Sequence, residues 1–354
     1  MQASPPLVSI IVTCFNYGRY VARAIESALG QTYQNVEVIV VNDGSRDDSR
    51  EVISRYEGRV RVIDQDNQGS IAAYNAGFAA SRGELILLLD ADDWLEPPLL
   101  ERVVEVWKPG VAKVQWDLKI VDARGRDLGR KFCNFDASYD AQRVREAFAR
   151  TGTYRWPVSV GNAYARWFAE RVFPLSPLHG PDGALNTVAP LYGAVVTIPE
   201  PLAAYRVHGQ NLWSNTGADA KRLPDRIGMR LAELALLGRH AAERGVELPS
   251  ESPIEHEIAF VNYRMLAQKL SLPYTGSARD TPRQLLGSAF RLLRRERYPL
   301  TARLAHGAWF GALYVSPPTV ARGLMRLRFG RGVAQGAWAD AKTRVLGRLR
   351  GQPA

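Results

Sequence analysis

The stretch LILLLDADD, residues 85–93, joins five consecutive apolar residues to three aspartates within four positions. An unbroken apolar run of this length is typical of a strand that is buried on both faces of a sheet. A carboxylate is costly to bury unless it is paired, protonated or bound to a metal. We therefore expect the strand to end at an edge of the sheet, where Asp90, Asp92 and Asp93 can meet a cation.

Similar apolar runs surround this strand and alternate with helical patterns. Strands are predicted at 7–13, 36–41, 59–63 and 84–89, and helices at 18–30, 47–56 and 69–81. Within 18–30 the apolar residues Val21, Ala24, Ile25 and Ala28 recur at helical spacing. Strands that alternate with helices indicate an α/β fold with a mainly parallel sheet and helices on both faces.

Three of these strands end in polar, partly acidic stretches. They are TCFN at 13–16, NDGS at 42–45 and DADD at 90–93. In parallel sheets the ligand crevice lies beyond the carboxyl ends of the strands. One such ending is ordinary loop chemistry, whereas three together predict a site.

The pattern changes further along the chain. A strand is predicted at 112–122, helices at 139–150 and 162–172, and one or two strands at 194–209, where Pro199 and Pro201 interrupt the run. From about residue 216 the pattern is purely helical, at 219–245, 254–271 and 282–296. We therefore predict a first domain over 1–215 and an all-helical region over 216–354.

The composition is that of a globular protein, with 46% hydrophobic and 23% charged residues. Two cysteines are too few for a disulfide framework or a cysteine-rich zinc site. MQASPPLVSI at the start has no basic segment and too short an apolar run for a secretory signal. A cytoplasmic location is therefore expected, with peripheral association on the inner face of the cytoplasmic membrane left open.

The net charge of +10 is unevenly placed. Residues 279–354 hold 15 Lys and Arg against 3 Asp and Glu, a net charge of +12, while the remaining 278 residues carry −2. A basic tail suggests an anionic partner, either a membrane surface or nucleic acid. Nucleic acid is not expected, because no recognition motif accompanies the charge.

Within the tail, LAHGAWFGALYVSPPTVA at 304–321 contains no Asp, Glu, Lys or Arg. A bilayer-spanning helix needs roughly 20 apolar residues, and this shorter run is broken at Pro317 and Pro318. Apolar and aromatic residues flanked by arginines fit an interfacial position on an anionic membrane. The alternative is a helical region that packs on the first domain while its arginines are solvated.

Asp90 and Asp92, two residues apart after a buried strand, suit a hard divalent cation. Mg²⁺ prefers oxygen ligands and commonly binds through one or two carboxylates together with substrate phosphates. The alternative is that Asp92 or Asp93 caps a helix opened by Pro97 and Pro98.

Asp43 ends the second predicted strand, and its carboxylate can accept a hydrogen bond from the N–H of a pyrimidine base. The alternative is a turn in which Asp43 and Gly44 supply the geometry. No G-x-G-x-x-G follows the first strand and no G-x-x-x-x-G-K-[ST] occurs, which excludes the Rossmann dinucleotide fingerprint and the P-loop. A nucleotide would then be held through carboxylate, metal and phosphate contacts.

Three segments stand in order along the chain: VSIIVTCFNYGRYVARAIESALGQTYQNVEVIVVNDGSRDDS (8–49), NQGSIAAYNAGFAASRGELILLLDADDWLEP (67–97) and YRVHGQN (205–211). Together they resemble a family 2 glycosyltransferase over roughly residues 6–215. The resemblance implies the GT-A (Rossmann-like) fold and a nucleotide-diphospho-sugar donor. It also implies a divalent cation, Mn²⁺ or Mg²⁺, and transfer with inversion at the anomeric carbon.

The resemblance also implies roles for residues at matching positions. Contacts with the nucleotide-sugar fall on Thr13, Phe15, Asn16, Asp43, Gly69, Asn75 and Asp90. Asp92 and His208 match the residues that bind the metal. The alternative for His208 is a histidine of a surface loop without such a role. The catalytic base falls on Asp182 in LHGPDGALN (178–186), although Pro181 stands where the family often has an acid. The alternative is that Asp182 only caps a helix that starts near Ala184.

Family members that extend a polymer processively usually carry a Gln-x-x-Arg-Trp signature and membrane spans. In this chain Gln210 and Trp213 are spaced differently and lack the Arg. We therefore predict a transferase that adds a single sugar to a glycan or lipid-linked acceptor in cell-surface polysaccharide or glycoconjugate synthesis. By family tendency, the predicted donor is a UDP-sugar. The alternatives are a nucleotidyltransferase of related fold and a non-catalytic sugar-nucleotide or glycan-binding module.

Overall fold

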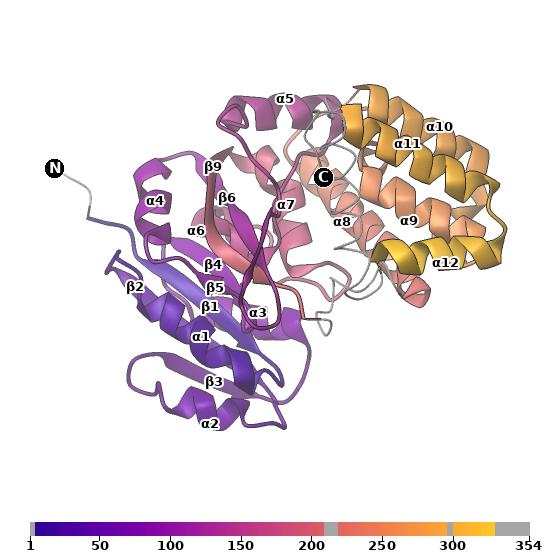
Figure 1. Ribbon diagram of the computed structural model, residues 1–354. Coiled ribbons are helices and arrows are strands. Elements are labelled where there is room, and N and C mark those ends of the chain that lie inside the picture. The colour runs from indigo at the N-terminus through magenta and orange to yellow at the C-terminus, as the bar shows by residue number, and fades with distance from the viewer. Residues whose placement is uncertain (1–3, 209–218, 296–299, 330–354) are drawn as a thin grey trace, which may run out of the picture. The chain divides into compact units, whose positions relative to one another are not determined.

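A computed structural model of the protein describes residues 4–208, 219–295 and 300–329 (Figure 1). The chain divides into two compact units, of which the first contains Met1–Val207 and Ala232–Ser250 and the second His208–Leu231 and Glu251–Ala354. The division therefore falls inside helix α8 (Leu223–Glu243). The domain boundary near residue 215 stays a prediction. Residues 209–211 of the third quoted segment and 330–354 of the basic tail lie outside the described residues.

A sheet of nine strands forms the centre of the first unit (Figure 1). Its strands are β1 (Val8–Cys14), β2 (Val36–Asp43), β3 (Arg61–Gln65), β4 (Leu85–Asp90), β5 (Trp94–Leu95), β6 (Val111–Val121), β7 (Asp127–Lys131), β8 (Asn162–Ala165) and β9 (Ala194–Arg206). Eight of them follow the order β3-β2-β1-β4-β8-β6-β9-β5, and β7 pairs with β6. Strands β1 to β4 are parallel, while β8 is antiparallel to β4 and β6. The predicted mixed, mainly parallel sheet is confirmed.

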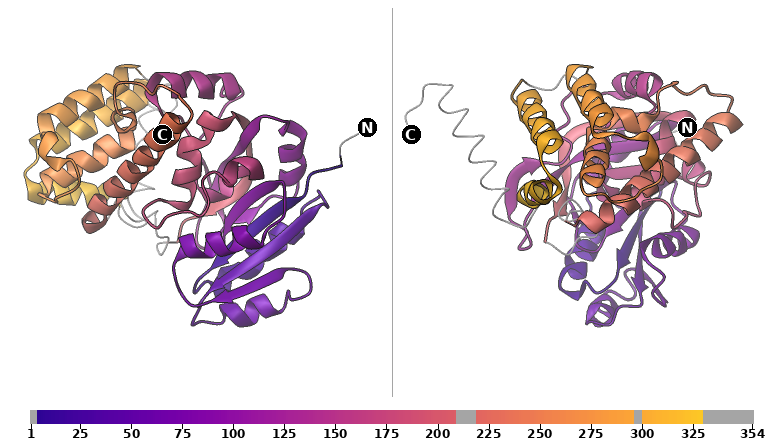
Figure 2. Two further views of the ribbon diagram at one scale, coloured as in Figure 1. Left: turned by 180° about the vertical axis from the view of Figure 1, so that it is seen from behind. Right: turned by 90° about the vertical axis from the view of Figure 1, so that its right-hand side faces the viewer.

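Helices cover both faces of this sheet, as Figures 1 and 2 show from three sides. They are α1 (Gly18–Leu29), α2 (Ser49–Ser54), α3 (Ser70–Ala80), α4 (Leu99–Val106), α5 (Ala141–Thr151), α6 (Arg166–Ala169), α7 (Pro181–Tyr192) and the 3-10 helix η1 (Ser159–Gly161). Apolar side chains of α1, α2 and α4 pack on one face, and those of α3, α5, α6 and α7 pack on the other. Each layer therefore buries one of the two alternating rows of strand side chains.

The segment 162–172 was predicted as a helix, and this prediction is wrong in its first part. Residues Asn162–Ala165 form strand β8, and only Arg166–Ala169 form helix α6. All four residues of β8 are buried, and they pair with β4 on one side and β6 on the other. The pairing of β8 with β4 and β6, which are distant in sequence, outweighs the helical spacing of the apolar residues in this segment.

The interrupted run at 194–209 forms one strand, β9, despite Pro199 and Pro201. The register between β6 and β9 shifts at this point, from the pair Trp116–Ile198 to the pair Asp117–Pro201. A proline cannot donate to a ladder, and such residues are tolerated at bulges. The irregular register therefore lets a single strand of 13 residues continue to Arg206.

The second unit is helical throughout its described residues, as predicted. Its elements are η2 (Ala220–Arg222), the first part of α8, η3 (Pro253–His256), α9 (Ile258–Lys269), η4 (Ser277–Arg279), α10 (Pro282–Arg295), α11 (Leu300–Val315) and α12 (Pro318–Phe329). These helices bury a common apolar core that includes Ile227, Met265, Leu285 and Phe310. Thr281 and Gln284 form a reciprocal capping box at the start of α10.

The apolar run at 304–321 is divided between α11 and α12, with the break at Ser316 and Pro317. The break therefore falls at the predicted prolines. Among the described residues, no helix combines the length and the apolar character that crossing a membrane requires.

Candidate active site

The carboxyl ends of β1, β2 and β4 turn three predicted site residues toward the same layer of helices. In the sheet register Thr13 lies beside Val41 of β2 and Asp90 of β4. Each site residue follows, by two positions, a residue that packs on the α3 side of the sheet. Ile11 precedes Thr13, Val41 precedes Asp43 and Leu88 precedes Asp90. Since strand side chains alternate between faces, the three site residues share that side.

Asp90 contacts helix α3 and lies near two other acids of the site. The hydroxyl of Tyr74 on α3 donates to Asp90 Oδ1 over 2.8 Å. The pKa of Asp90 is raised to about 7, first by burial and then by the negative charges of Asp92 and Asp182. The carboxylates of β4, the following turn and α7 are therefore close enough to repel one another.

The turn after β4 is fixed by backbone contacts. The Ala91 N–H donates to Thr13 O, and the Asp93 N–H donates to Asp90 O, each over 3.1 Å. Asp92 is only 6% exposed. Helix α4 begins at Leu99, and its N-cap is Pro98 without a side-chain cap. The alternative that Asp92 or Asp93 caps a helix is therefore wrong.

Asp93 holds the end of β9 against this turn. Its Oδ1 accepts from the Arg206 N–H over 2.8 Å, and Arg206 Nε donates to Asp92 O over 2.7 Å. The pKa of Asp93 is raised well above its usual value, first by burial and then by the charges of Asp92 and Asp90. Asp93 is therefore a structural partner of Arg206.

Aromatic rings enclose the Arg206 guanidinium. It lies 4.5 Å from the ring centroid of Tyr20 and 4.9 Å from that of Trp94, and Arg23 covers Trp94 at 3.3 Å. Such contacts are strongest where the cation is withdrawn from water, and Arg206 is buried. Arg206 was not among the residues predicted from the sequence, although it stands two residues before His208 in the quoted YRVHGQN segment.

Asp43 organises the segment before α3. Its carboxylate accepts from the side chain of Gln65 over 2.8 Å and from the backbone N–H groups of Gln68 and Gly69 over 2.9 and 2.8 Å. Gly69 has a φ of +88°, in the region that favours glycine. The predicted contact of Asp43 with a base stays a prediction, and the structure adds that this carboxylate fixes the segment 65–69.

The remaining predicted donor contacts occupy different settings. Phe15 is 40% exposed, whereas Asn16 adopts a φ of +56° and accepts from the Arg46 N–H through its side chain. Asn75 forms two hydrogen bonds with the backbone of Leu175, over 2.9 and 2.7 Å. The amide of Asn75 therefore anchors the chain that leads to α7.

Asp182 lies in the first turn of α7, whose N-cap is Gly180 and whose first residue is Pro181. The alternative that Asp182 only caps a helix starting near Ala184 is therefore wrong. Its negative charge contributes to raising the pKa values of Asp90, Tyr74 and Tyr164, after burial as the larger cause. Asp182 therefore faces the same group of side chains as the β4 aspartates.

A buried polar network holds α7 one turn beyond Asp182. Tyr154 donates to the Asn186 carbonyl over 2.8 Å, and Tyr164 donates to Asn186 Oδ1 over 3.0 Å. Lys113 on β6 donates to the Tyr154 hydroxyl over 3.1 Å and to Gln115 over 2.9 Å. The network fixes the rotation of the helix that carries Asp182.

Sequence reasoning missed this network, although β6 carries a signal for it. Lys113, Gln115 and Asp117 alternate with apolar residues in AKVQWDL, and all three are fully buried. The carboxylate of Asp117 accepts from the N–H groups of Cys133 and Phe135 over 3.0 and 2.8 Å. A polar row of period two on a strand that is buried on both faces indicates such a network, because buried polar groups need partners.

The donor set fits a divalent cation. Asp90 and Asp92, two residues apart at the end of β4, offer the hard oxygen ligands that such a cation prefers. After burial, the negative charge of Asp92 is the next cause of the raised pKa of Asp90, and a cation would offset that charge. Within the described ranges, no group of three or more His, Cys, Asp or Glu side chains is placed to hold a metal ion. His208 follows β9 as the first residue of the second unit, and its role as a metal ligand stays a prediction.

Residues 9–165 match the family described as Glycosyl transferase family 2. An uncharacterised glycosyltransferase of Nostoc sp. is 37% identical over 217 residues, a match that covers 58% of this chain. The match covers 66% of the length of this relative. The matches with two further glycosyltransferases cover 30% and 34% of their lengths.

Two solved structures share the fold. The crystal structure of S. aureus TarS 1-349 has a TM-score of 0.51 at 14% identity, over 92% of each chain. The mannosyltransferase PcManGT from Pyrobaculum calidifontis, solved in complex with GDP-Man and Mn²⁺, has a TM-score of 0.50 at 19% identity. That match covers 91% of this chain and 86% of PcManGT. At these identities the likeness concerns the fold alone.

Proposed function

Because this chain belongs to glycosyl transferase family 2, we propose that it moves a single sugar, with inversion, from a nucleotide-diphospho-sugar to a hydroxyl group of a glycan or lipid-linked acceptor. The observation that carries the proposal is the convergence of carboxylates from β4, the turn after it and α7. A binding module needs no such repulsive cluster, whereas a metal-dependent inverting transferase needs both a cation site and a base.

We propose that Asp92 holds the divalent cation, Mn²⁺ or Mg²⁺, with Asp90 beside it. The oxygen donors and the raised pKa of Asp90 support this assignment. A structural neighbour was solved with GDP-Man and Mn²⁺. When bound, the cation would supply Lewis-acid stabilisation of the charge on the leaving diphosphate. His208 as a further ligand remains an expectation from the sequence.

Asp182 is the proposed base. Its carboxylate would accept the proton of the acceptor hydroxyl while the oxygen attacks the anomeric carbon from the side opposite the diphosphate. One displacement from that side breaks the bond to the diphosphate and inverts the centre, so no carboxylate nucleophile is required. The network of Lys113, Tyr154 and Asn186 supports this role, because a general base must keep a fixed position relative to the proton that it takes.

The direct test of the donor is thermal unfolding with UDP- and GDP-sugars, with and without Mn²⁺. A ligand at a hundred times its dissociation constant stabilises the native state by about 2.7 kcal/mol. We therefore expect one nucleotide-sugar, a UDP-sugar first, to raise the melting temperature by a few degrees only when Mn²⁺ is present. The absence of a metal-dependent shift with every donor would contradict the proposal.

We also propose that the second unit associates with an anionic membrane surface. Leu300 and Leu304 lie four residues apart on α11 and are 69% and 65% exposed. Arg303 between them is exposed too. Exposed apolar side chains that alternate with arginine are the composition of an interfacial helix. Such a surface would place the enzyme on the inner face of the cytoplasmic membrane, close to a lipid-linked acceptor.

Replacing both Leu300 and Leu304 by Gln should weaken binding to anionic vesicles by about tenfold, because two apolar anchors are lost. Flotation of the full chain with phosphatidylglycerol vesicles measures this. Val246→Gln is the matched control, since Val246 is an exposed apolar residue of the first unit. Equal flotation of the double variant and the unchanged protein would remove the membrane proposal for α11.

A further inference from the structure

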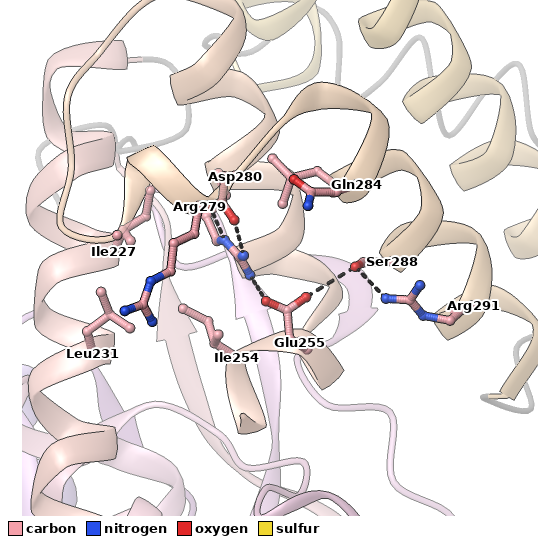
Figure 3. Close-up of a pocket in the computed structure, with 12 residues that line it drawn as sticks. Ile227, Leu231, Ile254, Glu255, Arg279, Asp280, Gln284, Ser288 and Arg291 are labelled. Carbon is pink, nitrogen blue, oxygen red and sulfur yellow. Dashed lines mark hydrogen bonds and ion pairs between the residues drawn. The ribbon is translucent and has the colours of Figure 1, made fainter. Parts of the chain in front are cut away.

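Buried carboxylates of this chain hold different kinds of partner in place. In the second unit, Glu255 and Asp280 line a cavity and both contact the guanidinium of Arg264, so they join side chains (Figure 3). In the first unit, Asp43 and Asp117 accept from backbone N–H groups. A buried acid needs such partners, and one that accepts from the backbone fixes a segment of the chain.

Glu233 of α8 is an acid of the second kind. It is 6% exposed, and its Oε1 accepts from the Gly180 N–H over 3.2 Å. Gly180 is the N-cap of α7, and Asp182 lies in the first turn of this helix. Glu233 and α7 both belong to the first unit. The carboxylate of Glu233 therefore reaches the end of the helix that carries the proposed base.

The first turn of α7 cannot form a capping box from its own side chains. In a capping box, a glutamate at the third helical position reaches back to the N–H of the N-cap residue. That position is Gly183, where a Cβ atom would lie 1.9 Å from Glu233 Oε1 and 2.4 Å from its Cδ. The Glu233 carboxylate therefore occupies the place of the missing side chain and forms the hydrogen bond that such a glutamate would form.

The surroundings of this contact are fixed on both sides. Leu237 of α8 and Leu185 of α7 belong to one buried cluster, so the two helices pack together beyond the contact. Before the helix, Asn75 holds the backbone of Leu175 by two hydrogen bonds. Between these anchors, Glu233 contacts the turn that presents the base.

We propose that Glu233 is a positioning residue for the transfer reaction, because its carboxylate caps α7 from α8 and thereby sets the place of the Asp182 carboxylate. The inference rests on the proposed function, in which Asp182 takes the proton of the acceptor hydroxyl. A base acts only within hydrogen-bond reach of that proton, and a displacement of about 1 Å can cost about a hundredfold in rate. Loss of the cap should therefore lower the rate and leave the donor contacts at the ends of β1, β2 and β4 in place.

The first experiment compares Glu233→Ala with Glu233→Gln. Alanine removes the acceptor of the Gly180 N–H, so kcat should fall about tenfold or more. The dissociation constant of the nucleotide-sugar in the presence of Mn²⁺ should stay within about twofold. Glutamine keeps an oxygen that can accept from Gly180, so kcat should stay within about threefold of the unchanged protein. General damage to the structure would instead weaken donor binding together with kcat.

Gly183→Ala tests the same contact from the side of α7. Alanine favours a helix over glycine, so an effect on helix propensity alone would not lower kcat. The added methyl group would displace the Glu233 carboxylate, and we expect kcat to fall about tenfold or more. In a Glu233→Ala background this collision is absent, so adding Gly183→Ala should change kcat by less than about twofold. Equal losses in both backgrounds would overturn the proposal.

Glu243→Ala is the matched control, because Glu243 is an exposed acid at the end of the same helix. Its kcat should equal that of the unchanged protein. The proposal is wrong if Glu233→Ala behaves like this control, or if glutamine at position 233 fails to restore kcat.

Hydrogen exchange tests the cap without any turnover. The amides of 184–186 bond to the carbonyls of 180–182 in an α-helix, and they should exchange about fivefold or more faster in Glu233→Ala than in Glu233→Gln or Glu243→Ala. Equal exchange in all three variants would refute the cap. Absence of turnover in the unchanged protein would contradict the proposed function instead, and the exchange result would still decide whether Glu233 holds α7.

Discussion

Asp182→Asn should lower kcat by ~10²–10⁴-fold, the usual contribution of a positioned general base. The amide keeps the shape of the side chain but cannot take the proton of the acceptor hydroxyl. Donor affinity should stay within about twofold, because a base for the acceptor leaves the donor contacts in place. Steady-state kinetics and nucleotide-sugar titration of the same preparation measure both quantities.

Asp225→Asn is the position-matched control for this variant. Asp225 is an exposed acid in the first turn of α8, as Asp182 is in the first turn of α7. The general effect of an acid near a helix N-terminus is therefore the same in both variants. Near-normal turnover of Asp182→Asn would show that another group is the base. An equal loss in both variants would show that helix stability is the cause.

The elements around the site could be predicted where apolar runs are continuous. Strands β1, β2 and β4 lie at the centre of the sheet, so burial on both faces leaves an unbroken apolar signal in VSIIV, VIVV and LILLL. Because parallel strands end at one edge, the gathering of Thr13, Asp43 and Asp90 follows from the order of elements.

The rest of the site depends on contacts between residues that are far apart in sequence. The hydrogen bond between Asp93 and Arg206 spans 113 residues, and the one between Asn75 and Leu175 spans 100. Local periodicity carries no information about such pairs. For the same reason β8 was mistaken for a helix, since its strand conformation comes from the ladders with β4 and β6.

Asp92→Asn should remove both turnover and the stabilisation that a nucleotide-sugar gives in the presence of Mn²⁺. A Lewis acid at a leaving phosphate contributes several kcal/mol, which at about 1.4 kcal/mol per factor of ten is ~10³-fold or more in rate. This variant differs from Asp182→Asn, because it should lose donor binding as well as rate. Metal titration followed by nucleotide release separates the two effects.

The neighbouring variant Asp93→Asn supplies the control within the same turn. Burial and the charges of Asp92 and Asp90 raise the pKa of Asp93, so its carboxyl tends toward the neutral form that an amide imitates. Asn can also still accept from the Arg206 N–H. Metal-dependent donor binding should therefore survive in Asp93→Asn and vanish in Asp92→Asn. The reverse result would move the cation to Asp93 and would require the contact with Arg206 to break when the metal binds.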